Sequence, residues 1–534
     1  MNAIPKRVCI VKINAVLTAL SLIFCIASAA ISPLWGQEPS AANEIHFNPE
    51  SECKTYNRMI FGQFIEHFHR QVYGGIFEPG SPLSDKDGFR TDVIAAMREL
   101  KVPIVRWPGG CFVSSYHWLD GVGPNRQPAY DKAWHVEDPN TFGTVEFVKL
   151  CRLIGAEPYI CTNAGTGTEE EMSDWVEYCN LNIGKFGRMR QKHGCPEPLN
   201  VRYWSIGNEN WGGHEMGAKT IPQWGPFVRE SAKLMLNTDP DIKLFAAALP
   251  DENWTLPLLQ TAGHLLNYVS IHGYWDWMTH HNNPSSYMAC MVRTGAPEND
   301  ILRTINILDR TGNRGRVGIA FDEWNLRGWH HPGHGSPVMD VAARDKNDIN
   351  SVYTMADALF SACFLNTCLR HCEDVKIACF SPVVNTRGAL FVHKNGVVKR
   401  TTYHVFYLYA NKLKEQVAPI EIRCRNIECG EERTPILDAI LTCNPEKTQF
   451  AMAIVNKSPD TVEKLTICGG SSSNGVLPVK DGTISALVLQ GSSPDDYNDI
   501  GAENRVVPET RNLKVVDSAV KIPPHSLVII QWEK

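Results

Sequence analysis

Two patterns of hydrophobic and polar positions alternate along residues 45–402: short, mostly apolar runs and longer amphipathic stretches. The apolar runs predict strands buried on both faces, because such strands need no polar alternation. The eight runs are Met59–Ile65, Val102–Arg106, Glu157–Thr162, Arg202–Ile206, Lys243–Ala247, Tyr268–His272, Val317–Phe321 and Lys376–Phe380.

The stretches between these runs carry apolar residues at helical spacing. Strands that alternate with helices favour a parallel sheet, and eight of them fit a closed (β/α)8 TIM barrel better than an open sheet. No Gly-rich dinucleotide fingerprint follows the first strand, which argues against a Rossmann fold. Helices are predicted at Thr91–Leu100, Thr144–Ile154, Asp174–Phe186, Trp224–Leu236 and Ile349–Leu369.

A different pattern begins near Tyr403. Short alternating segments are separated there by turn-rich loops, which is typical of an antiparallel β-sandwich. We therefore predict a barrel at 45–402 and a C-terminal β-sandwich at 403–534, with 45–54 as a candidate extra strand of the sandwich. The segments are Phe450–Val455, Val462–Ile467, Ile484–Leu489, Leu513–Val516 and Leu527–Trp532.

The N-terminus has the pattern of a signal peptide. Three basic residues within the first twelve precede the apolar stretch 15–26, and Ala27-Ser28-Ala29 offers a small-residue cleavage pattern. We predict a signal peptide and leader at 1–37, cleaved near 29–37, and a secreted or periplasmic mature protein. An uncleaved membrane anchor is the alternative, but the apolar core is short for a span of about 20 residues.

Composition excludes several classes of function. The hydrophobic fraction is 43% and the charged fraction 21%, as in ordinary soluble proteins. Removing residues 1–29 takes away three positive charges, so the formal charge changes from -6 to -9. Without a basic stripe, nucleic acid is not an expected partner, and no membrane contact is expected after signal removal.

Neither cysteine nor histidine indicates a metal site. Fifteen of the 17 cysteines remain after signal removal, no C-x-x-C pair occurs, and most fit buried positions. Pairing of Cys424 with Cys429, or of Cys443 with Cys468, stays open. The histidines at 330, 331 and 334 lie in a Pro- and Gly-rich loop without cysteine or acid partners. We expect no metal and no cofactor.

Two predicted strands end in a glutamate. Glu209 follows Tyr203–Ile206 in the fourth strand position, and Glu323 follows Val317–Phe321 in the seventh. They are 114 residues apart, or three β/α units of about 38 residues. Both should project from the carboxyl-terminal face of the barrel, where barrel active sites lie. A pair of carboxylates suits acid and nucleophile chemistry on a glycosidic bond.

Six motifs make the chain resemble glycoside hydrolase family 51, the retaining α-L-arabinofuranosidases. They occur in the family's order over residues 45–410, and the sandwich that follows is also the family's arrangement. Gly207-Asn-Glu209 alone is weak evidence, whereas the set of six is highly specific. The motifs are Phe61-Gly-Gln-Phe-Ile-Glu-His67, Tyr73-Gly-Gly-Ile-Phe-Glu-Pro79, Arg106-Trp-Pro-Gly-Gly110, Tyr116-His-Trp-Leu-Asp-Gly-Val-Gly-Pro124, Gly207-Asn-Glu209 and Phe321-Asp-Glu-Trp-Asn325.

The resemblance implies a general acid/base, Glu209, and a nucleophile, Glu323. It also implies five substrate-binding positions. Among these, Glu66 would hold sugar hydroxyls or the ring oxygen, Asn208 would bond the 2-hydroxyl, and Tyr274 would orient the nucleophile. The remaining two, under and beside the sugar, are Arg106 and Cys111.

Two departures from the family's pattern affect sugar contacts. The chain has Pro382 where the family usually has a sugar-binding Gln, and Arg327 where a Trp is frequent. Proline cannot donate a hydrogen bond. Asn385, Arg387 and Arg327 are the polar candidates for a compensating contact, so the choice of furanoside stays open.

The expected function is hydrolysis of terminal α-L-arabinofuranosyl groups from arabinose-containing polysaccharides or oligosaccharides, as in arabinan degradation. The alternative enzyme is an endo- or exo-β-glucanase of the same clan. A more distant alternative is a non-catalytic carbohydrate-binding protein, which the intact pair Glu209 and Glu323 disfavours. Family members often form oligomers, so a homo-oligomer stays open.

Overall fold

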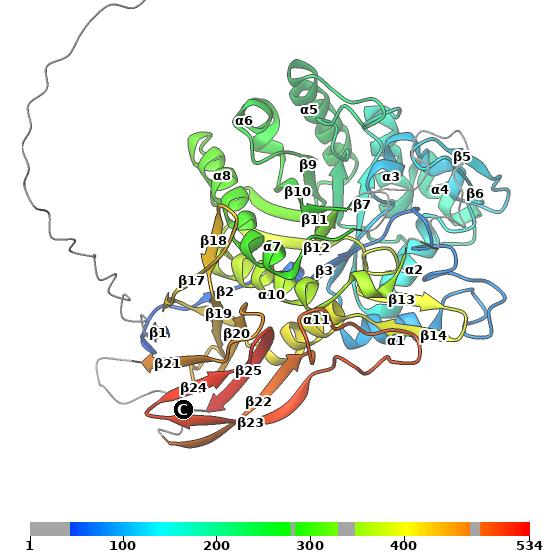
Figure 1. Cartoon of the computed structure of the whole chain (residues 1–534). Helices are drawn as coiled ribbons and strands as arrows, with labels where there is room; N and C mark the ends of the chain where they lie inside the picture. The colour runs from blue at the N-terminus through cyan, green and yellow to red at the C-terminus, as the bar shows by residue number, and fades with distance from the viewer. Residues whose placement is uncertain (1–42, 279–282, 329–345, 347, 470–480, 534) are drawn as a thin grey trace, which may run out of the picture. The chain divides into compact units, whose positions relative to one another are not determined.

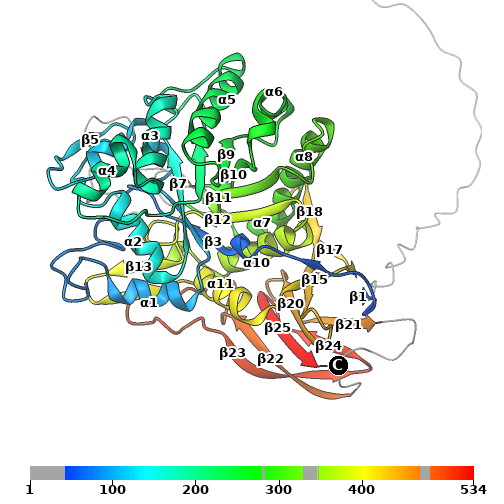
Figure 2. The same ribbon diagram turned by 180° about the vertical axis from the view of Figure 1, so that it is seen from behind.

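The computed structural model describes residues 43–278, 283–328, 346, 348–469 and 481–533. The predicted signal peptide and leader and the histidines at 330, 331 and 334 lie outside these ranges. Two large β-structures, a closed barrel and a larger sheet built mostly from the C-terminal part, account for most strands of the described residues, and three two-stranded sheets accompany them (Figures 1 and 2).

Eight parallel strands close the barrel in chain order, which confirms the predicted fold class. Aromatic and apolar side chains from the strands pack together in the lumen, among them Phe64, Tyr159 and Phe245. The strands are β3 (Gly62–Phe64), β4 (Ile104–Trp107), β7 (Glu157–Thr162), β8 (Tyr203–Ile206), β9 (Lys243–Ala247), β10 (Tyr268–Trp277), β11 (Gly318–Gly328) and β12 (Val375–Phe380).

Helices surround the barrel strands (Figure 1). The predicted helix at Asp174–Phe186 is in fact two helices. The Glu177 carboxylate accepts the backbone N–H of Phe186 (2.6 Å) and caps the second one, which starts at Gly184 with φ +79°. The helices are α1 (Thr91–Glu99), α2 (Thr144–Ile154), α3 (Glu169–Asn180), α4 (Gly184–Lys192), α5 (Ile221–Thr238), α6 (Glu252–Ala262), α7 (Tyr287–Val292), α8 (Ala296–Arg310), α10 (Met355–Arg370) and α11 (Thr401–Lys412).

The start of α10 also differs from the predicted helix at Ile349–Leu369. Thr354 and Asp357 form a capping box, so the helix begins at Met355. Every residue of α10 except Arg370 is buried, because the helix packs on barrel strands and on strands of the second sheet. It therefore joins the cores of the two β-structures.

Residue 403, where the sequence pattern changes, lies in the first turn of α11. The predicted start of the β-sandwich therefore falls within a helix. In the structure all residues from Thr401 to Phe406 are buried, so both faces of the helix start are covered. The strands of the second sheet follow from Gln416 onward.

The second sheet has eleven hydrogen-bonded strands in the order β16-β1-β21-β24-β23-β22-β25-β20-β19-β15-β2. It is antiparallel except for the pair β1 and β21. The strands are β1 (Asn43–Phe47), β2 (Lys54–Thr55), β15 (Gln416–Ala418), β16 (Ile420–Arg423), β19 (Leu437–Cys443), β20 (Gln449–Asn456), β21 (Glu463–Gly469), β22 (Gly482–Gln490), β23 (Glu509–Val516), β24 (Ala519–Ile522) and β25 (Ser526–Glu533).

The N-terminal segment is part of this sheet. β1 pairs with β16 on one side and with β21 on the other, and β2 pairs with β15. Between them, the Cys53 Sγ lies 3.4 Å from the Cys443 Sγ. Cys443 thus contacts Cys53, a neighbour that the sequence pattern does not reveal.

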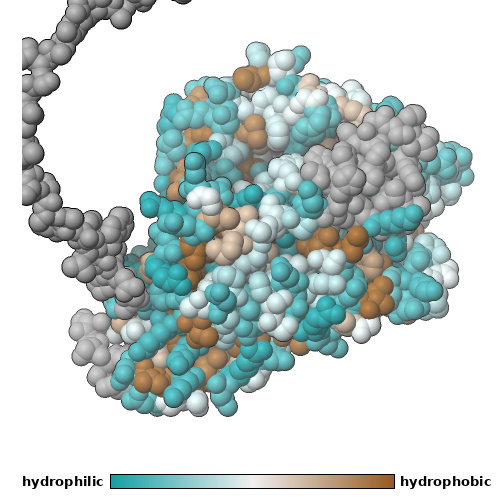
Figure 3. All heavy atoms as spheres, viewed as in Figure 1, coloured by the Kyte–Doolittle hydropathy of each residue, from teal (hydrophilic) through white to brown (hydrophobic). Residues whose placement is uncertain are grey.

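The surface seen in Figure 3 is largely hydrophilic, with hydrophobic residues singly or in small groups. Among the described residues, no helix has the length and apolar character needed to cross a membrane.

Candidate active site

Glu209 stands on a sharp turn directly after β8. A Cβ at Gly207 would lie 1.9 Å from the Asn210 side chain, and the φ of Gly207 is +74°. Glu209 itself has a φ of +44°, which is uncommon for a residue with a side chain. The turn is specified by its glycine and carries the carboxylate over the end of the barrel.

Glu323 lies on a bulge in β11. Ser270 of β10 is opposite Ala320, and two residues later His272 is opposite Glu323, so β11 has one extra residue. The same shift occurs against β12. In a regular strand, successive side chains face opposite sides. The bulge instead lets both Asp322 and Glu323 face the interior, where they are 0% and 8% exposed.

His272 links the two catalytic candidates. Its Nδ1 lies 2.8 Å from Glu209 Oε1 and 3.6 Å from Glu323 Oε2. A carboxylate oxygen from each glutamate and a ring nitrogen of His272 all lie within 4.8 Å of one another. The two carboxylates therefore face one another across a single small space.

Glu323 is held on both of its oxygens. Arg106 Nη1 donates to Oε2 (2.8 Å), and the Tyr274 hydroxyl donates to Oε1 (2.6 Å). Arg387 in turn donates to the Tyr274 hydroxyl (3.0 Å) and lies over its ring. Charge-assisted bonds of this kind fix the carboxylate in one orientation.

Asn208 connects Arg106 to a second buried carboxylate. Its Oδ1 accepts from Arg106 Nη2 (2.7 Å), and its Nδ2 donates to Glu215 Oε1 (2.9 Å). Glu215 also interacts with the Cys111 thiol. Asn208 and Cys111 therefore lie on one continuous polar network.

Glu66 lies against a backbone that only glycine permits. A Cβ at Gly109 would be 2.3 Å from the Glu66 side chain. Glu66 Oε1 accepts the backbone N–H of Phe112 (3.1 Å) and the indole N–H of Trp134 (3.0 Å). Burial, together with the charge of Glu323, raises the pKa of Glu66 to about 8.

The electrostatics around His272 depend on three carboxylates. Burial alone would lower its pKa, but the charge of Glu323 and hydrogen bonds to Asp322 and Glu209 raise it to about 10. Burial would raise the pKa of Glu209, yet the hydrogen bonds and charges of His214 and His272 lower it below its ordinary value. Arg106 and His272 likewise outweigh burial and lower the pKa of Asp322.

The structure brings the seven residues predicted from the sequence to one end of the barrel. Several of their neighbours were not predicted. Asp322 and His272 stand inside or beside the motifs that end strands, so their positions could have suggested them. His214, Glu215 and Trp134 lie in loops, and no sequence pattern marks them.

Two of the three candidates for a compensating sugar contact are structural. Arg327 is 1% exposed and is held by the carboxylates of Asp276 and Asp357. Asn385 is fully buried, donating to Arg70 O and accepting from Val392 N. The expectation that these two side chains reach the sugar rim is wrong, because their hydrogen bonds are made inside the protein. Only Arg387 lies beside the carboxylates.

Family models match most of the barrel and the C-terminal part. The α-L-arabinofuranosidase 1 domain matches residues 96–290, and the α-L-arabinofuranosidase C-terminal domain matches residues 322–526.

Known proteins match nearly the whole chain. A probable α-L-arabinofuranosidase C of Aspergillus clavatus is 33% identical over 89% of this chain and 94% of its own length. An intracellular exo-α-(1->5)-L-arabinofuranosidase 1 of Bacillus subtilis is 31% identical over 78% of this chain and 84% of its own. The crystal structure of a Thermotoga maritima α-L-arabinofuranosidase in an arabinose complex has a TM-score of 0.81 and 32% identity, covering 92% of this chain and 100% of that one.

The raised pKa of Glu66 leads to a prediction about stability. In the unfolded chain the pKa of a glutamate is about 4.3, whereas folded Glu66 keeps its proton up to about pH 8. Between these values the folded state binds one more proton, so the free energy of unfolding falls as pH rises. Glu66→Gln removes this dependence. Its stability relative to wild type, measured by urea denaturation, should therefore increase from about pH 5 to about pH 8 and then level off.

Glu428→Gln, at an exposed position, is the control and should show no such trend. A Glu66→Gln difference that stays constant over this pH range would contradict the raised pKa.

Proposed function

Because the chain belongs to the α-L-arabinofuranosidases of glycoside hydrolase family 51, we propose that it cleaves its substrates with net retention through Glu209 and Glu323. The enzyme is an α-L-arabinofuranosidase, and its substrates are arabinose-containing glycans. The observation that carries the mechanism is the approach of one oxygen of each carboxylate to within 4.8 Å. Retaining enzymes have carboxyl groups about 5 Å apart, and inverting enzymes place them up to about 9 Å apart.

In the first step Glu323 attacks the anomeric carbon and Glu209 protonates the departing oxygen. Arg106 and Tyr274 each hold one oxygen of Glu323, which limits its motion before attack. The proton for Glu209 has a nearby source, since His272 Nδ1 lies 2.8 Å from Oε1. Transfer along this hydrogen bond places the proton on Glu209.

In the second step Glu209 acts as general base on water, which attacks the anomeric carbon and frees Glu323. In the covalent intermediate, Glu323 is bonded to the sugar as an ester and carries no charge. This removes the main interaction that raises the pKa of His272. The electrostatic environment of Glu209 therefore changes between the steps, as an acid that later serves as a base requires.

Glu66, Asn208 and Cys111 are the proposed sugar contacts. Each of them is held by hydrogen bonds from neighbouring residues. Glu66 accepts from Phe112 and Trp134, Asn208 accepts from Arg106, and the Cys111 thiol interacts with Glu215. Family membership favours this activity over that of a β-glucanase. The intact carboxylates, each held by specific hydrogen bonds, argue against a protein that only binds carbohydrate.

We further propose export, which rests on the basic and apolar pattern of residues 1–29. Exported chains meet thiol–disulfide oxidants. In protein recovered from its own host we expect an N-terminus between residues 29 and 38 and a Cys53–Cys443 disulfide, because these thiols already touch. A non-reducing peptide map by mass spectrometry detects both the N-terminus and the disulfide. A chain that still begins at Met1 with free Cys53 would contradict export.

The roles of the two glutamates are separable by substitution. Glu323→Ala should abolish turnover of aryl α-L-arabinofuranosides, because no other group forms the covalent intermediate. Glu209→Ala should still react with substrates that have good leaving groups and then stall, and azide should restore its turnover, since azide needs no general base. Azide rescue of Glu323→Ala with retained configuration would mean that the two roles are reversed.

The Tyr274 hydroxyl provides a test of nucleophile positioning. Tyr274→Phe removes a hydrogen bond to a charged group, worth about 1.5–3 kcal/mol. We expect kcat to fall roughly 10- to 100-fold with little change in KM, because the bond holds Glu323 and not the sugar. Tyr268→Phe, at the opposite end of the same strand, is the matched control and should retain wild-type kcat. A loss confined to KM would instead place Tyr274 in substrate binding.

A further inference from the structure

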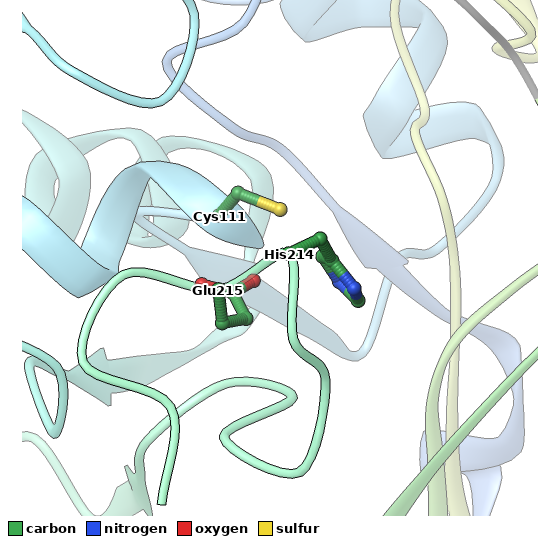
Figure 4. A group of neighbouring side chains, drawn as sticks. All are labelled: Cys111, His214 and Glu215. Atoms are coloured by element: carbon green, nitrogen blue, oxygen red, sulfur yellow. The ribbon is translucent and has the colours of Figure 1, made fainter. Parts of the chain in front are cut away.

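Cys111, His214 and Glu215 form a cluster of side chains (Figure 4), and His214 contacts the catalytic Glu209. We propose that these three side chains bind a Zn²⁺-like transition-metal ion and that the bound ion inhibits the enzyme. Metal binding stands on the geometry alone, whereas its inhibitory effect rests on the proposed function of the neighbouring Glu209.

The three ligand atoms come from two adjoining segments. Cys111 opens the 3-10 helix η2 (Cys111–Ser115), and the other two residues are consecutive in the loop after β8. One ligand atom from each residue lies within 4.8 Å of the others. Tetrahedral Zn²⁺ with bonds of about 2.0–2.3 Å needs ligand atoms roughly 3.3–3.8 Å apart. The His214 side chain, 52% exposed, is free enough of packing to make up the difference.

Glu215 has the support that a metal-binding carboxylate needs. It is 4% exposed, with Oε2 accepting from the Ser114 hydroxyl (2.6 Å) and Oε1 accepting from Asn208 Nδ2 (2.9 Å). Each carboxylate oxygen has a second lone pair available for an ion. Outer hydrogen bonds of this kind orient the ligands of protein metal sites. An acidic residue on an open surface lacks such outer hydrogen bonds, so Glu215 is better oriented for an ion than a surface carboxylate.

The set of donor atoms identifies the class of ion. A thiolate, an imidazole and a carboxylate together suit Zn²⁺ and ions of similar preference such as Co²⁺, whereas Mg²⁺ and Ca²⁺ prefer oxygen ligands. The Cys111 thiol loses its proton to solvent when it binds the ion. Three protein ligands leave a fourth position for water.

A bound ion would affect catalysis through two contacts. His214 Nε2 lies 2.9 Å from Glu209 Oε2, so drawing the ring toward the ion removes a partner of the proposed acid/base. Cys111 and Asn208 are proposed to contact the sugar, and the ion would occupy the space beside them. We therefore expect inhibition that a chelator reverses.

The competing location is the group Glu209, His272 and Glu323, whose ligand atoms also lie within 4.8 Å of one another. It contains no sulfur, and Arg106 and Tyr274 already occupy Glu323. Sulfur ligation therefore distinguishes the two locations experimentally.

The test is titration of the metal-stripped full-length chain with CoCl₂ and ZnCl₂, with metal binding measured directly. We expect one tight site and a sulfur-to-cobalt charge-transfer band in the near ultraviolet. Cys111→Ser should lose the band. Its affinity for the ion should fall by at least the roughly 10- to 100-fold that removal of an outer-shell partner causes. Cys195→Ser, at a cysteine of similar exposure outside the cluster, is the matched control and should behave as wild type.

His214→Asn is the second variant, because an exposed side chain can be replaced without loss of the fold. The affinity of this variant for Co²⁺ should also fall about tenfold or more. Wild-type affinity or an unchanged band in Cys111→Ser would overturn the site. Tight sulfur-dependent binding without inhibition of arabinofuranoside hydrolysis would overturn the inhibitory role. Because binding is measured apart from turnover, an inactive enzyme with an intact metal site would count against the proposed function alone.

Discussion

The Arg106 guanidinium is the interaction on which the active site depends. It is fully buried and contacts Glu323, Asn208 and, at 3.6 Å, Asp322. Buried carboxylates are expensive unless they are paired and hydrogen-bonded. At this end of the barrel three of them, Glu209, Asp322 and Glu323, surround Arg106 and His272. Without the arginine, Glu323 and Asp322 would lose the positive charge beside them, and Glu323 would also lose the bond to its Oε2. The charge arrangement and the orientation of the nucleophile therefore both depend on this residue.

Much of the barrel could be predicted because its strands are covered on both faces. Full burial leaves apolar runs that stand out in the sequence, and all eight were found. The pattern failed at two boundaries. The predicted start of the sandwich at residue 403 falls within the buried helix α11, and the predicted helix Asp174–Phe186 covers the end of α3 and the start of α4, which residues 181–183 separate.

The site was predictable where a barrel strand carries or directly precedes the residue and unpredictable where a loop supplies it. Glu209 follows β8, and Glu323 lies on the bulge of β11, which continues past its predicted end at Phe321. His214 and Glu215 reach the site only through the path of a loop, which no periodicity encodes. The prediction for Arg327 was wrong for a different reason. Its place near the rim suggested a sugar contact, but ion pairs with Asp276 and Asp357 hold its side chain inside the protein.

The position of β1 affects how the chain is made. Asn43 donates to Glu463, a residue 420 positions further along, and β1 fills the gap between β16 and β21. During synthesis the first strand to leave the ribosome must therefore wait, with its edges unpaired, until almost the whole polypeptide has emerged. Any proteolytic trimming of the amino terminus has to stop short of residue 43, since a deeper cut would leave β16 and β21 without the strand that joins them.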